Sequence, residues 1–213
     1  MNGKGGVKTM CGRYYLKSDD MSHVVATLLN SLAFKAGDNG KTQGDIYPGD
    51  TAPVLSHNRR GDIRAFFMDW GFHADKKRIF NARAETAAAR PLFRDSMQNR
   101  RCLIPASLYY EWDTAHHVKH DFFPEVGKGL LLAGLYRQEQ DGRYSYTVLT
   151  RDAAPHLAPL HPRMPVILPA DALPQWLSPA CDPMTILLNA RTDIACRLSG
   201  QVPLDKIKPD LLY

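Results

Sequence analysis

The chain has 213 residues, of which 44% are hydrophobic and 23% charged, and its formal net charge is +5. This composition is typical of a globular protein and excludes a disordered, collagen-like or coiled-coil chain. No apolar run approaches the ~18 residues that span a bilayer, so we expect no membrane contact. The four cysteines lack CxxC spacing and follow no secretory segment, which predicts a reduced, cytoplasmic protein.

The first half of the chain is predicted to contain a tail, one helix and several strands. Residues 1–10 are polar and rich in glycine, and we expect a flexible extension that is either a mis-assigned start or a leader. Ser18 is the expected N-cap of a helix that continues through Leu32 and closes at Gly37. The other expected elements are strands at residues 11–16, 52–56 and 63–70, with a loop at 44–50.

The second half is mostly predicted as strand. Two short helices are expected at residues 84–90 and 93–99, the first stopped by Pro91. Strands are expected at 102–105, 108–112, 130–136, 144–150 and 164–168, followed by a helix at 171–177. Asp141-Gly142 is a strong hairpin signal between two of these strands. We therefore predict one α+β domain whose short, mostly antiparallel strands form a curved, barrel-like core flanked by helices.

Basic residues are concentrated in one segment. Residues 76–101 hold eight lysines and arginines but only Glu85 and Asp95 as acids, so the rest of the chain is close to neutral. Such a local excess suits a polyanion, and nucleic acid is the most common one. The alternative is a charged face that only contacts water.

Four short motifs hold residues that are suited to chemistry. Cys11 is close to Arg13, and a nearby cation favours the thiolate, although a free cysteine is more often a small buried apolar residue. Asn81 and Thr86 bound a segment at a loop-to-helix junction, and both have side chains that suit helix capping. Arg83 in this segment can hold a phosphate; alternatively, the segment only caps the helix.

Glu111 and His161 are the candidate proton carriers. Glu111 is expected on the same face of a strand as Tyr109, where aromatic surroundings would raise its pKa; alternatively it faces water at a sheet edge. His161 can transfer protons near neutral pH or be an ordinary turn residue, and Arg163 can hold a second phosphate. His116, His117 and His120 resemble a metal cluster only loosely, because no carboxylate or cysteine completes it. We expect neither metal nor cofactor.

Taken together, the motifs resemble a known family. Residues 10–14, the segment from Asn81 to Thr86, residues 101–106 leading to Glu111 and Trp112, and the segment from His161 to Leu168 occur in the family's order and spacing. They are similar to the SOS-response-associated peptidase (SRAP) family of abasic-site processing proteins, over residues 10 to about 177. The resemblance implies an SRAP-like domain at residues 11–213 that acts as a cytoplasmic monomer, associated with the nucleoid when bound to DNA.

The resemblance also implies a chemistry. An N-terminal cysteine is a 1,2-aminothiol, which can condense with the aldehyde of an abasic site in single-stranded DNA and close a thiazolidine crosslink. Cys11 would be this residue, Asn81 would position the sugar or the amine, and Glu111 and His161 would transfer protons. Arg13, Arg83 and Arg163 would contact DNA, and Trp70 would stack near the site.

The sequence departs from the family pattern at the start of the chain and near the histidine. Ten residues precede Cys11, so its α-amine is free only if translation starts at Met10 or if the protein cleaves its own leader. Pro162 stands where the family usually has an aspartate after the histidine, and the usual second tryptophan after Trp70-Gly71 is missing. The alternatives are a non-covalent single-stranded DNA-binding module and a cysteine peptidase that uses Cys11 and His161.

Overall fold

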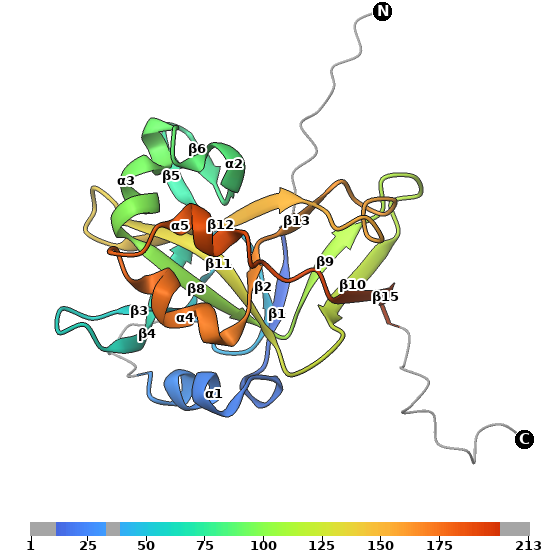
Figure 1. Ribbon diagram of the computed structural model, residues 1–213, viewed down its shortest axis with the longest axis horizontal. Coiled ribbons are helices and arrows are strands. Elements are labelled where there is room, and N and C mark those ends of the chain that lie inside the picture. Colours follow the sequence, from blue (N-terminus) through green and yellow to red (C-terminus); the bar gives the residue numbers. More distant parts are fainter. Residues whose placement is uncertain (1–11, 33–38, 201–213) are drawn as a thin grey trace, which may run out of the picture.

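The computed structural model describes residues 12–32 and 39–200. Its largest sheet closes on itself because β12 pairs with both β11 and β4, while β3 and β8 complete the ring. The bounds of these strands are β3 Thr51–His57, β4 Ile63–Trp70, β8 Arg101–Ala106, β11 Leu130–Gln138 and β12 Tyr144–Asp152. The ring confirms the predicted curved α+β core, and its pairs are antiparallel except for β12 with β4. Figure 1 shows it at the centre of the molecule.

Three short strands extend this sheet. β7 (Asn81–Arg83) pairs in parallel with β12, and β13 (Arg163–Pro165) pairs with the end of β12. β14 (Ile167–Leu168) instead pairs with β11. The single strand predicted at residues 164–168 is therefore divided at Val166, where the chain changes from one partner strand to the other.

A second sheet of five strands has the order β15-β10-β9-β1-β2. Its strands are β1 Tyr14–Leu16, β2 Gly44–Ile46, β9 Leu108–Trp112, β10 Lys119–Pro124 and β15 Ile194–Leu198. A separate ribbon of β5 (Phe72–Ala74) and β6 (Lys77–Ile79) lies close to α2 and α3 at one end of the molecule (Figure 1). The strand predicted at 108–112 is confirmed, whereas β2 was expected to be loop.

The helices are short and lie outside the barrel (Figure 1). They are α1 His23–Asn30, α2 Ala84–Ala87, α3 Pro91–Asn99, α4 Leu173–Leu177 and α5 Pro183–Leu187, with 3-10 turns at Ser18–Asp20 and Ala170–Ala172. No helix among the described residues is long and apolar enough to cross a membrane.

Two predicted helix boundaries are wrong. Ser18 begins only a 3-10 turn, because Met21 is extended and buried, and α1 starts after Ser22 instead. α2 ends at Ala87 rather than Arg90, because Arg90 adopts the extended conformation that favours a following proline and then caps α3. Residues 1–10, Cys11 and the expected helix end at Gly37 lie outside the described residues.

The core fills the barrel with aromatic and branched side chains. Trp70, Tyr146, Leu103 and Ile104 are fully buried there. Gly134 on β11 is required by close packing, because a Cβ atom at this position would lie 2.3 Å from Cδ1 of Ile104. This interior fixes β12, β7 and β13, which carry part of the candidate site.

Candidate active site

Glu111 and His161 lie together although 50 positions separate them in the sequence. Oε1 of Glu111 is 4.0 Å from Nδ1 of His161. Glu111 is on β9, and His161 is in the loop between β12 and β13. The backbone N–H of Thr114 donates to the carbonyl of Leu160 at 3.0 Å, which fixes that loop against the end of β9. The structure therefore brings the two predicted proton carriers into one buried pair, 5% and 6% exposed.

The backbone of Arg163 orients the His161 ring. Nδ1 lies 3.0 Å from the carbonyl oxygen of Arg163 and 3.3 Å from its backbone nitrogen, so either neutral tautomer finds a partner. Pro162 supplies no carboxylate, but its carbonyl accepts a hydrogen bond from Ala153 at 3.0 Å and holds the turn in place. The His161 ring therefore contacts the backbone of Arg163 and the carboxylate of Glu111.

The start of the described chain runs beside Glu111. Tyr14 pairs with Tyr109, and the backbone N–H of Tyr110 donates to the carbonyl of Arg13 at 3.0 Å. Continuing this antiparallel register by one residue places Gly12 opposite Glu111. Cys11, the predicted nucleophile, lies outside the described residues.

Asn81 and Arg83 reach the same region through β7. Asn81 pairs with Val148 and Arg83 with Thr150, so β7 runs alongside the part of β12 that leads toward the His161 loop. Asn81 is partly buried, whereas Arg83 is exposed and precedes α2. No ion pair within the described residues involves Arg83, so its guanidinium is available to an anion.

Arg163 is held by two carboxylates that sequence reasoning did not connect with it. Its guanidinium forms a two-point ion pair with Glu85, at 2.7 and 2.8 Å, and a further ion pair with Asp152. The hydrogen bond from Arg163 lowers the pKa of Glu85. A phosphate would have to replace one of these partners. Glu85 lies in the same sequence motif as Asn81 and Arg83, and this was the one sign in the sequence that it belongs near the site.

Trp70 and Arg13 are not placed as expected. Trp70 is fully buried, is stacked on Tyr146 with ring centroids 6.2 Å apart, and donates from Nε1 to the carbonyl of Phe80. The expectation that Trp70 stacks on DNA is therefore not met, because neither face of its ring is accessible. Arg13 forms an ion pair with Asp45 and, by strand alternation, lies on the opposite face of the sheet from Glu111.

The basic segment forms an exposed surface next to Arg83. Lys76, Lys77, Arg90 and Arg94 are all exposed, and none of them is in an ion pair with another described residue. They lie on the β5–β6 ribbon and around α2 and α3, which are grouped at one end of the molecule (Figure 1). Arg101 differs from these four residues, because it is buried and its guanidinium donates to backbone carbonyls.

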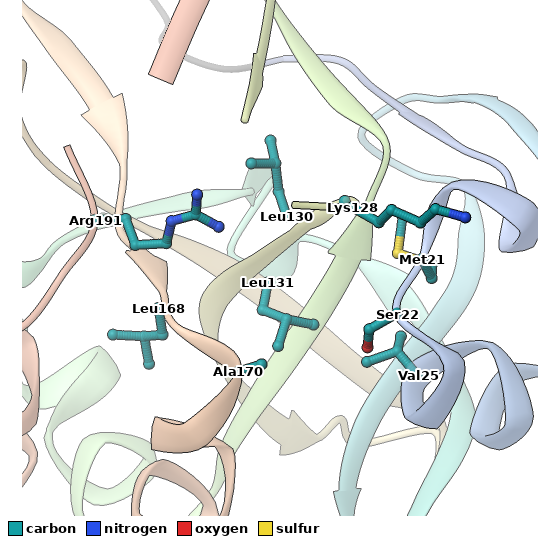
Figure 2. Close-up of a pocket in the computed structure, with 10 residues that line it drawn as sticks. Met21, Ser22, Val25, Lys128, Leu130, Leu131, Leu168, Ala170 and Arg191 are labelled. Carbon is teal, nitrogen blue, oxygen red and sulfur yellow. The ribbon is translucent and has the colours of Figure 1, made fainter. Parts of the chain in front are cut away.

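Two cavities among the described residues lie elsewhere. One of about 50 Å³ lies between α1, the start of β11 and the end of β14, with Met21, Val25, Leu130 and Arg191 around it (Figure 2). This volume suits one or a few water molecules. A larger depression of about 850 Å³ lies along the β3–β4 hairpin and is lined by Arg59, Arg64, Phe66 and Tyr144 among others. Neither is lined by a predicted site residue.

Several curated relatives are similar in sequence to this chain. An abasic site processing protein of Bacillus subtilis, YoaM, is 33% identical over 138 residues, which are 58% of this chain and 59% of the relative. YedK of Escherichia coli, also described as an abasic site processing protein, is 24% identical over 179 residues, 79% of each chain. The chain thus spans about 60% of the length of the Bacillus relatives that it matches.

Two solved structures and a family model also match this chain. A crystal structure of a Bordetella bronchiseptica protein has a TM-score of 0.71 and 26% identity, covering 90% of this chain and all of that one. A phage-related protein of the same organism has a TM-score of 0.69 at 22% identity, which shows the fold. Residues 10–197 match the model for the SOS response associated peptidase (SRAP) family. This chain belongs to that family.

Proposed function

We propose that this protein captures abasic sites in single-stranded DNA as a covalent thiazolidine adduct of Cys11. The observation that carries the proposal is the buried Glu111–His161 pair, since Glu111 lies on β9 beside β1, the first described strand after Cys11. Cys11 precedes that strand by three positions in the sequence. The relatives YoaM and YedK are abasic site processing proteins, which supports the same substrate.

The proposed reaction loses one water molecule. The free α-amine of Cys11 adds to the C1′ aldehyde of the ring-opened sugar, and water leaves to give a Schiff base. The thiolate then adds to the carbon of the C=N bond while the nitrogen takes a proton, which closes the five-membered ring. Glu111 and His161 would transfer the protons of these steps and of sugar ring opening. Asn81 would hold the sugar or the amine by hydrogen bonds.

DNA would be held mainly through its phosphates. Arg83 is exposed and free of ion pairs with described residues, and the exposed lysines and arginines around α2 and α3 extend the same positive surface. Binding of this kind depends strongly on salt and reads little sequence. Arg163 would join when a phosphate replaces Glu85 or Asp152 as its partner.

The test compares two forms of the protein on single-stranded DNA that carries one abasic site. One form starts at Met1, and the other starts at Met10 and is confirmed by intact mass to begin at Cys11. We expect a band resistant to denaturing electrophoresis from the Cys11 form, and none from the Met1 form unless its mass falls by the first ten residues. Cys11→Ser of the short form should give at most a labile adduct.

Other outcomes would refute the proposal. A salt-sensitive complex without any covalent band would leave a non-covalent DNA-binding module. Turnover of a peptide that does not need DNA would instead identify a cysteine peptidase. A band from a Met1 form whose mass stays intact would exclude the thiazolidine, because the nitrogen of Cys11 is then an amide.

A further inference from the structure

A second histidine lies beside Glu111. In the pairing of β9 with β10, His120 is directly opposite Glu111. Directly opposed residues of an antiparallel pair project to the same face, with Cβ atoms about 4.5–5.5 Å apart. The side chain of His120 is 12% exposed, so it shares the buried surroundings of Glu111.

A fixed carboxylate just beyond the end of β9 holds this histidine. Oδ2 of Asp113 is 3.4 Å from Nε2 of His120. The backbone N–H groups of His116, Val118 and Ala115 donate to the Asp113 carboxylate. These bonds lower the pKa of Asp113, and the bond from His116 has the largest effect. Asp113 is therefore an anion held in place by the loop between β9 and β10.

The charged neighbours of His120 are few. On β9 they are Glu111 and Asp113, and the loop adds His116, whose Nδ1 is 3.6 Å from the other oxygen of Asp113. On the other side β15 places Leu198 opposite His120. Lys119 and Asp121 alternate to the opposite face of β10. Two carboxylate–histidine pairs, Asp113 with His120 and Glu111 with His161, are thus neighbours through the cross-strand position of His120 opposite Glu111.

We propose that His120, held by Asp113, is a positioning residue that acts on the Glu111 carboxylate from the neighbouring strand β10. A protonated imidazole at this distance favours the ionised carboxylate, and Glu111 in turn favours the protonated imidazole. The effect on crosslinking rests on the proposed function, whereas the coupling between the two side chains does not. Sequence reasoning considered His120 only as a weak metal ligand.

The coupling is tested by following the histidine ring signals by NMR as the pH is changed in the full chain. His120→Gln assigns the signal by its loss. Because each substitution removes a negative charge beside the imidazole, we expect Glu111→Gln to move the pH response of the His120 ring signals to lower pH, and Asp113→Asn to do likewise. Glu125→Gln is the matched control: it removes the same charge just beyond β10, about 16 Å along the strand, and should leave His120 unmoved. A midpoint that Glu111→Gln does not move overturns the inference.

The catalytic consequence is tested by the pH dependence of crosslinking in the form that begins at Cys11. In His120→Gln, Glu111 loses a neighbour that can carry a positive charge, so the acid limb of the rate profile should move to higher pH. A purely structural defect would lower the rate equally at every pH, and that outcome overturns the positioning role. His23→Gln on exposed α1 is the control. Absence of crosslinking by wild type at every pH would refute the proposed function, while NMR would still decide the coupling.

Discussion

Glu111 is the residue whose replacement separates chemistry from binding. Glu111→Gln keeps the size of the side chain and removes its ability to exchange protons. We expect the single-turnover crosslinking rate to fall by roughly 100-fold or more, since a positioned acid or base contributes about 10²–10⁴-fold. Affinity for DNA with a non-reactive abasic analogue, measured by fluorescence anisotropy, should change little because phosphates dominate binding.

Asp113→Asn is a useful comparison, because it alters a nearby carboxylate that bonds to His120 rather than His161. Its crosslinking rate should fall less than that of Glu111→Gln. A Glu111→Gln protein that crosslinks at the normal rate would show that Glu111 carries no proton in the slow step.

Arg83 and Arg163 are predicted to behave differently although both are arginines of one site. Arg83 is exposed and has no ion-pair partner among the described residues, so Arg83→Ala should weaken DNA binding and reduce the salt slope by about one charge. Arg163 already bonds to Glu85 and Asp152, so Arg163→Ala should also lower the melting temperature. Titrations at several salt concentrations, with thermal melts alongside, distinguish the two. Equal salt slopes in wild type and Arg83→Ala would contradict the assignment.

At the scale of single residues, the sequence predicted what each side chain can do better than it predicted which residues that side chain contacts. Glu111 lies on the face of Tyr109 as predicted, because both belong to the unbroken register of β9 with β10, opposite His120 and Phe122. The ion pair of Arg163 with Glu85 joins residues 78 positions apart, and no local pattern encodes it. Trp70 was expected near the site from the family resemblance, but it is buried inside the barrel.

Among the elements, Arg101 on β8 ties the barrel to helices α3 and α4. Its guanidinium donates to backbone carbonyls of Met97, Trp176, Ser178 and Cys181, and no carboxylate within residues 12–32 and 39–200 bonds to it. Arg101→Met would leave several of these buried carbonyls without a donor. We expect the free energy of unfolding in urea to fall by roughly 3 kcal/mol.

The neighbouring Arg100 provides the control for that measurement. It is exposed and forms an ion pair only with Asp95, so Arg100→Met should change stability by less than about 0.5 kcal/mol. Equal effects of the two substitutions would mean that the Arg101 network does not hold these helices.

Elements with long apolar or alternating patterns were predictable, and short polar ones were not. β4 was expected at its observed bounds, and the hairpin at Asp141-Gly142 joins β11 to β12 as predicted. β10 and β15 were missed because their polar residues show no clear alternation; each becomes a strand by pairing with the other, some 75 positions away. β7 is similar, since its three residues gain their bonds from β12.

At the scale of the whole molecule, carboxylates that bond to arginines make the folded protein more stable at neutral than at acidic pH. Glu85 on α2, Asp141 in the hairpin and Asp193 before β15 each have a pKa lowered chiefly by a hydrogen bond from an arginine. A carboxyl group with a lowered pKa in the folded state stabilises the protein above its unfolded pKa, which is about 4. That contribution is lost as the pH falls through the folded value. Stability should therefore decline below about pH 4.

Glu85→Gln tests this origin of acid sensitivity. The substitution keeps the shape of the side chain but cannot be protonated, so the free energy of unfolding should depend less steeply on pH below about 4 than in wild type. Urea unfolding between pH 3 and 7 measures the slope, and Glu125→Gln, an exposed carboxylate that bonds to no described arginine, should keep that of wild type. If Glu85→Gln also keeps it, the ion pair with Arg163 does not form in solution. Arg163 would then be available to phosphate as freely as Arg83, and the two arginines would share one salt dependence of DNA binding.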